Sequence, residues 1–167
     1  MDTLKLIQPI GSSLFERKVC LTMWYAYTII VVFLLILLFM PKKLTLKEMY
    51  YSAGVLGFGA WLGDALIGDV FKGFRIGPSP DTYLIDYIFI SFIPLALGLI
   101  YLNFLTQNKS VLYKWLWVAA AYLLEWGTVV SGYMVNKAWK TWYSIPVYIL
   151  VFVVLLPWHL KTMRNEQ

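Results

Sequence analysis

The sequence predicts an all-α integral membrane protein, a bundle of five transmembrane helices joined by short turns. Of its 167 residues, 60% are hydrophobic and 14% are charged, whereas a soluble domain is about half apolar and a quarter charged. The hydrophobic residues form continuous runs of about 20, the length at which a helix crosses a bilayer. Strands of a membrane barrel would instead alternate apolar and polar residues. The 8 Trp and 12 Tyr residues suit the two membrane–water boundaries.

The first two elements are an interfacial tail, residues 1–19, and a transmembrane helix, residues 20–40. The tail is polar, and Pro9 and Gly11 are expected to interrupt any long helix there. The apolar run that follows ends at Pro41 and two lysines without a small-residue cleavage site. It therefore indicates a membrane span rather than a signal peptide.

Four further spans follow, each separated from the last by a turn that is polar or rich in Gly and Pro. The second span begins after a lysine-rich turn, the third after Gly-Pro-Ser-Pro, the fourth after Gln-Asn-Lys-Ser and the fifth after Lys-Ala-Trp-Lys-Thr. No soluble domain fits between them, so residues 20–160 form one membrane domain and residues 161–167 a short polar tail. The predicted spans are residues 49–67, 83–105, 111–132 and 142–160.

Charge does not decide which way the bundle faces. With five spans the N-terminus shares one side, here called side A, with the turns 68–81 and 133–141. Side A and the opposite side B each carry seven Lys and Arg residues, so the positive-inside rule gives no orientation. The basic residues lie where lipid headgroups would meet them, so the net charge of +5 does not indicate a nucleic-acid partner.

Three carboxylates are predicted to lie inside the bundle, in its side A half. Asp64 lies on a stripe of small residues at helical spacing, and Glu125 lies on a similar stripe in the fourth span. Asp86 shares the first turn of the third span with Tyr83 and Tyr87. Because an acid at membrane depth usually has a partner or a task, these five residues are predicted to line a polar pocket that opens toward side A.

Four basic residues are predicted to form the rim of that pocket. Lys72 and Arg75 lie in the second turn, and Lys137 and Lys140 lie in the fourth turn. Two interpretations stay open. The rim can bind anionic lipid headgroups, or its members can pair with the acids and only fix the register of the helices.

The remaining chemistry-bearing residues receive a structural interpretation. Asp69 and Asp81 are expected at solvated helix ends, where Asp81 can cap the third span. Cys20 fits ordinary packing and His159 a boundary anchor. One Cys and one His exclude an intrachain disulfide and a bis-histidine haem site. Phosphate-loop, metalloprotease and nucleophile-elbow motifs are missing from the sequence, so no metal site or cofactor is expected.

One family resemblance rests on a set of short motifs. They are Asp64, the block LIDYIFISFIPLALGLIYLNF around Asp86, the inward Glu125, Tyr133, Trp139 and the run Trp142-Tyr143-Ser144. Through these motifs residues 42–161 resemble a family of small, uncharacterised multi-spanning membrane proteins from endospore-forming Gram-positive bacteria. The resemblance implies the helical architecture, a multi-pass location in the plasma membrane, and a common role for these acids and aromatic residues.

Three function classes remain open. The favoured one is a binding or assembly protein, whose pocket pairs internally or holds a lipid headgroup or a segment of a partner, either a second copy of the chain or another membrane protein. The first alternative is a proton- or cation-linked transport unit that uses Asp64, Asp86 and Glu125 as relay or ligands. The second is a lipid-modifying membrane enzyme, which is favoured least because the sequence identifies no nucleophile–base pair.

Overall fold

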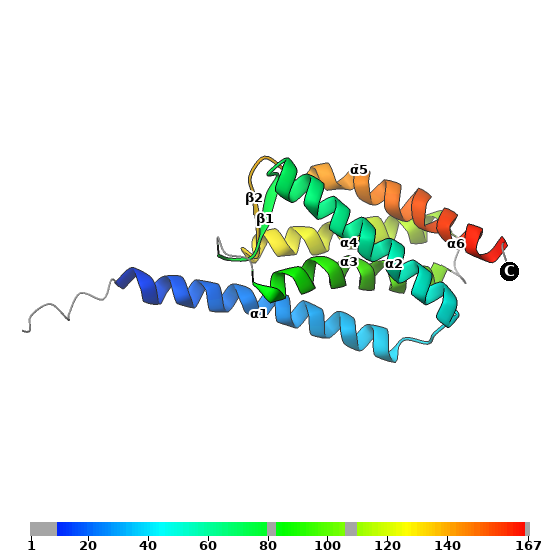
Figure 1. Ribbon diagram of the computed structural model, residues 1–167, viewed down its shortest axis with the longest axis horizontal. Helices are drawn as coiled ribbons and strands as arrows, with labels where there is room; N and C mark the ends of the chain where they lie inside the picture. The colour runs from blue at the N-terminus through cyan, green and yellow to red at the C-terminus, as the bar shows by residue number, and fades with distance from the viewer. Residues whose placement is uncertain (1–9, 80–82, 106–109, 166–167) are drawn as a thin grey trace, which may run out of the picture.

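Five long helices lie side by side in the computed structural model, which describes residues 10–79, 83–105 and 110–165 (Figure 1). The second helix ends in a π-helical segment, and the fifth passes through 3-10, α and π segments without a break. Their bounds are α1 (Ile10–Phe39), α2 (Leu46–Gly63) with η1 (Asp64–Val70), α3 (Leu84–Leu105), α4 (Val111–Val130), and η2 (Thr141–Tyr143), α5 (Ser144–Ile149), η3 (Leu150–Leu155) and α6 (Leu156–Asn165).

The all-α class is confirmed, and four of the helices are long and apolar enough to cross a membrane. These segments are Thr22–Phe39, Leu46–Val70, Leu84–Leu105 and Thr141–Arg164. The fourth helix, α4, is not among them, and it carries Lys114 and Glu125. Five membrane crossings therefore remain a prediction.

The first helix begins earlier than expected. It starts at Ile10, so the second half of the expected tail, residues 10–19, belongs to α1. Gly11 lies in the first turn and does not break the helix, because glycine costs a helix only about 1 kcal/mol. The end of the apolar run marks where a membrane span would begin, but it does not limit how far the helix continues. The N-terminal part of α1 extends beyond the rest of the bundle (Figure 1).

Two short strands join the second and fourth turns. Strand β1 (Phe74–Ile76) pairs antiparallel with β2 (Met134–Asn136), and Arg75 lies opposite Val135. Around them, the Gly73 carbonyl accepts the N–H groups of Lys137 and Trp139, each at 2.8 Å, and the Gly77 N–H donates to the Tyr133 carbonyl at 2.8 Å. We call residues 73–77 and 133–139 the ribbon. The ribbon lies at the end of the bundle opposite the C-terminus (Figure 1).

The third helix is the centre of the fold. In its most apolar stretch of 18 residues 61% are buried, against 6% in the corresponding stretch of α1 and none in that of α2 with η1. It packs so closely on α2 that a side chain at Gly98 would collide with Leu56. Its Tyr101 hydroxyl donates to the Phe152 carbonyl in η3 at 2.5 Å. At the start of α3, Asp86 contacts Gly77 and Tyr133, the residues next to the two ribbon strands.

Candidate functional site

Asp86 is a fully buried carboxylate that joins α3 to the ribbon. Its Oδ1 accepts the Tyr133 hydroxyl at 2.5 Å, and its Oδ2 accepts the Tyr83 N–H at 2.8 Å. The second bond satisfies a backbone donor at the start of α3, where a helix has no acceptor of its own. Gly77 makes room for the carboxylate, since its φ is +94° and a Cβ there would lie 2.6 Å from Oδ2. We call this arrangement the Asp86 lock.

The Tyr133 side chain is as deeply buried as its partner. It is 0% exposed, and its ring meets Phe89 edge to face, with 4.9 Å between the ring centroids. Burial, together with the hydrogen bond to Asp86, raises the pKa of the Tyr133 hydroxyl well above its usual range. The phenol therefore keeps its proton and acts as a permanent donor to the carboxylate.

Glu125 is held by a second hydrogen-bonded group, which is separate from the Asp86 lock. Ser144 donates to its Oε1 at 2.8 Å and the Tyr148 hydroxyl to its Oε2 at 2.6 Å. The Trp139 indole N–H in turn donates to the Ser144 hydroxyl at 2.9 Å. We call these four residues the Glu125 relay. It ties α4 to the fifth helix and to the end of the ribbon.

Asp64 is the least constrained of the three predicted acids. It opens η1 and is half-buried, and its Oδ1 lies 3.2 Å from the position of a Cβ on Gly68. No hydrogen bond to its side chain is found within the described residues. The three acids thus have different neighbours, and no direct contact joins any two of them in the described part of the chain. A common pocket floor remains a prediction.

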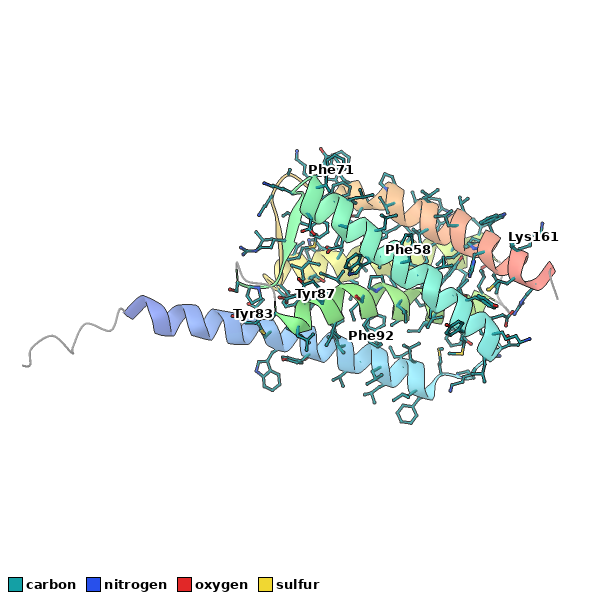
Figure 2. The ribbon with its side chains drawn as sticks, viewed as in Figure 1. Phe58, Phe71, Tyr83, Tyr87, Phe92 and Lys161 are labelled. Carbon is teal, nitrogen blue, oxygen red and sulfur yellow. The ribbon has the colours of Figure 1, made fainter. Side chains whose placement is uncertain are left out.

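The other predicted site residues lie at the surface near the ribbon. Tyr83 and Tyr87 expose 44% and 53% of their surface at the start of α3 (Figure 2). Tyr83 contributes its backbone to the Asp86 lock but not its hydroxyl. Asp69 is exposed, as expected, whereas Asp81 and the side chain of Cys20 lie outside what the structure describes.

The four predicted rim residues all belong to the ribbon end of the bundle. Lys72, Lys137 and Lys140 are exposed, and Arg75 is half-buried with its Nε unpaired among the described residues. Across residues 10–79, 83–105 and 110–165, none of the four forms an ion pair. Within these residues the rim therefore forms no ion pairs with Asp86 or Glu125 that would fix the register of the helices. The two carboxylates accept hydrogen bonds from hydroxyl and backbone N–H groups instead.

Lys72 adopts a backbone conformation that glycine would adopt more easily. Its φ is +48°, in the left-handed region, where a residue with a side chain costs about 1–2 kcal/mol. It follows the last turn of η1, and the next residue, Gly73, closes the turn by donating its N–H to the Ile67 carbonyl at 2.8 Å. The chain thus places a lysine, rather than the neighbouring glycine, at the strained position.

A polar group at the opposite end of the bundle was not expected from the sequence. The Ser52 hydroxyl lies 3.2 Å from His159 Nε2, and the Glu48 carboxylate pairs with Arg164 Nε at 2.9 Å. Glu48 and Ser52 are one helical turn apart on one face of α2, a spacing that could have identified them. Because Ser52 is 0% exposed, a substrate cannot reach it, and the pair acts as a contact between α2 and α6.

The described residues contain no metal-binding cluster. Nowhere among them do three or more His, Cys, Asp or Glu side chains lie close enough together to hold a metal ion. The structure instead has a hydrogen-bonded ribbon with neighbouring lysines, and this ribbon lies next to two carboxylates whose hydrogen-bond donors are uncharged. Comparison with protein-family models, curated proteins and solved structures finds no match in any of the three.

Proposed function

We propose that this chain is a multi-pass protein of the plasma membrane with a binding or assembly role, and that its ribbon end binds anionic lipid headgroups. One observation carries the proposal. Lys137 lies in the hydrogen-bonded ribbon, and Lys72 and Lys140 directly adjoin it in the chain; among the described residues none of the three has an acidic partner. Each basic residue near an anionic membrane surface contributes about 1 kcal/mol to binding.

The construction of the ribbon supports this proposal. Both turns are held by backbone hydrogen bonds and by the Asp86 lock, so the lysines project from a fixed base. Strained backbone persists where the surrounding structure enforces it, commonly at functional sites, and Lys72 is such a residue. A lysine after a helix end is also favoured by the helix dipole, but by less than about 1 kcal/mol.

The transport and enzyme alternatives receive less support. Asp86 and Glu125 already accept two hydrogen bonds each from different partners, which suits structural anchoring better than transfer of a proton between them. The serine that contacts the histidine is fully buried, although the histidine itself is only half-buried, so the pair does not present its hydroxyl at the surface. A second copy of the chain or another membrane protein remains a proposed partner.

Lipid binding by charge-matched variants tests the proposal. Lys72, Lys137 and Lys140 are changed together to Gln, and affinity for vesicles with phosphatidylglycerol is compared with that for phosphatidylcholine alone. Loss of about 3 kcal/mol, or roughly 100-fold, is expected. A second triple variant, which serves as control, changes three exposed lysines elsewhere on the chain: Lys42, Lys43 and Lys161. Lys161 lies near the C-terminal end of the bundle (Figure 2). Equal losses in both variants would contradict a binding role for the ribbon.

A further inference from the structure

Glu125 is a partly buried carboxylate without a cationic partner. Its two hydrogen bonds come from the neutral hydroxyl groups of Ser144 and Tyr148, and among the described residues it forms no ion pair. A carboxylate removed from water loses several kcal/mol of solvation, and two neutral hydrogen bonds return only part of that loss. The relay therefore stabilises the charged form of Glu125 only in part, and a cation from outside the chain would stabilise it further.

The direction of the hydrogen bonds leaves Glu125 as an acceptor. The Trp139 indole can only donate, so Ser144 accepts from it and gives its own proton to Glu125 Oε1. A carboxylate offers about four lone-pair sites, and these two bonds use two of them. The free sites suit a group with several N–H donors, such as a primary ammonium.

Trp139 brings this acceptor and the cationic ribbon together. It is part of the Glu125 relay through its indole and part of the ribbon through its backbone N–H. In the chain it lies between Lys137 and Lys140, both of which are exposed. A segment with two exposed lysines is thus linked, through Trp139 and Ser144, to the Glu125 carboxylate of α4.

Aromatic rings flank the same segment. Tyr143 packs against Trp139 and Trp142, with ring centroids 5.5 Å and 4.3 Å apart, and Trp142 is 56% exposed. Such rings favour the headgroup level of a bilayer, and their faces attract ammonium groups. A ligand that carries both a phosphate and an ammonium would match this arrangement of lysines, rings and carboxylate.

We propose that this segment recognises the headgroup of an aminophospholipid of the phosphatidylethanolamine class. Its phosphate contacts Lys137 and Lys140, and its terminal primary ammonium donates to Glu125. The phosphate half rests on the function proposed above, whereas the ammonium half depends on Glu125 alone. A primary ammonium fits better than a trimethylammonium, because only the former has N–H groups for the free lone pairs.

Vesicle binding with three lipids tests the ammonium half. Wild-type protein is expected to bind phosphatidylethanolamine about tenfold more tightly than phosphatidylcholine, which has the same phosphate and the same net charge but no N–H groups on its ammonium. Glu125→Gln should abolish that difference and leave phosphatidylglycerol binding unchanged. Asp69→Asn, at an exposed acid in η1, is the matched control and should retain the difference. The wild-type comparison needs no variant, so it decides the matter even where Glu125→Gln folds poorly.

The outcomes separate this inference from the proposed function. Equal binding of phosphatidylethanolamine and phosphatidylcholine would overturn the ammonium contact, while phosphatidylglycerol binding that depends on Lys72, Lys137 and Lys140 would still support the proposed function. No binding of any lipid would overturn both. Free phosphoethanolamine, added as a competitor, is expected to displace the lipid weakly. Equal affinity for the free compound and the lipid would overturn the assignment of a lipid as ligand.

Discussion

The hydrogen bond between Tyr133 and Asp86 makes a quantitative prediction about stability. Changing Tyr133 to Phe removes the hydroxyl and leaves Asp86 Oδ1 without its side-chain donor, in a residue that is 0% exposed. A hydrogen bond to a charged group contributes about 1.5–3 kcal/mol, and complete burial favours the upper end of that range. We therefore expect Tyr133→Phe to lower the free energy of unfolding by about 3 kcal/mol.

A double-mutant cycle shows whether that loss belongs to the pair. Asp86→Asn keeps the shape of the side chain but removes one acceptor and the charge, at a cost of about 2 kcal/mol. In the double variant the two losses should overlap by about 1–2 kcal/mol, because each change removes the same bond. Unfolding by SDS in mixed micelles, followed by Trp fluorescence, measures all of these free energies.

The control for this cycle is Tyr83→Phe. Tyr83 supplies only its backbone N–H to the same carboxylate, and its side chain is 44% exposed, so the change should cost less than about 0.5 kcal/mol. The reasoning is refuted if the losses at Tyr133 and Asp86 add to within about 0.3 kcal/mol. It is also refuted if Tyr133→Phe destabilises no more than Tyr83→Phe.

Four further predictions concern backbone, packing and charge. Gly77→Ala should cost about 3 kcal/mol or more in chemical unfolding, because φ is +94° and the Cβ would meet the buried carboxylate at 2.6 Å. Gly98→Ala should cost about 1–3 kcal/mol through collision with α2, whereas Gly54→Ala, with open space around it, should be neutral or stabilising by up to about 1 kcal/mol. The pKa of Tyr133 is higher in the folded state than in the unfolded state. The phenol therefore contributes fully to stability below about pH 10, where the unfolded phenol ionises, and this contribution is lost as the pH rises further. Above that pH the urea midpoint of wild type should fall more steeply than that of Tyr133→Phe. Lys72→Gly should raise thermal stability by about 1 kcal/mol and weaken binding to anionic vesicles, and unchanged stability would argue against strain at that position.

Hydrophobic runs were sufficient to predict the helices but not all of their limits. The apolar run that begins at Cys20 predicted a membrane span, yet α1 continues back to Ile10, because helical hydrogen bonds need no apolar side chains. The strands were not predictable in this way. Each is three residues long, too short for any alternating pattern, and each finds its partner in a distant turn.

Helical spacing identified which acids face inward but not what they meet. Asp86 is fully buried and Glu125 partly buried, in agreement with their predicted faces. Their partners Tyr133, Ser144 and Tyr148 come from a turn and from the last helix, and no local pattern connects them to the acids. A periodic pattern reports the side of a helix that is covered, whereas the neighbour depends on how the helices pack.

The distance along the chain between Asp86 and Tyr133 has a consequence for biosynthesis. The two residues are 47 positions apart, so a ribosome completes α3 and α4 before the donor for the carboxylate exists. Until then Asp86 has only the nearby Tyr83 N–H, and strand β1 has no partner. Asp86 therefore gains its side-chain donor, and β1 its partner strand, only after the fourth turn has been synthesised.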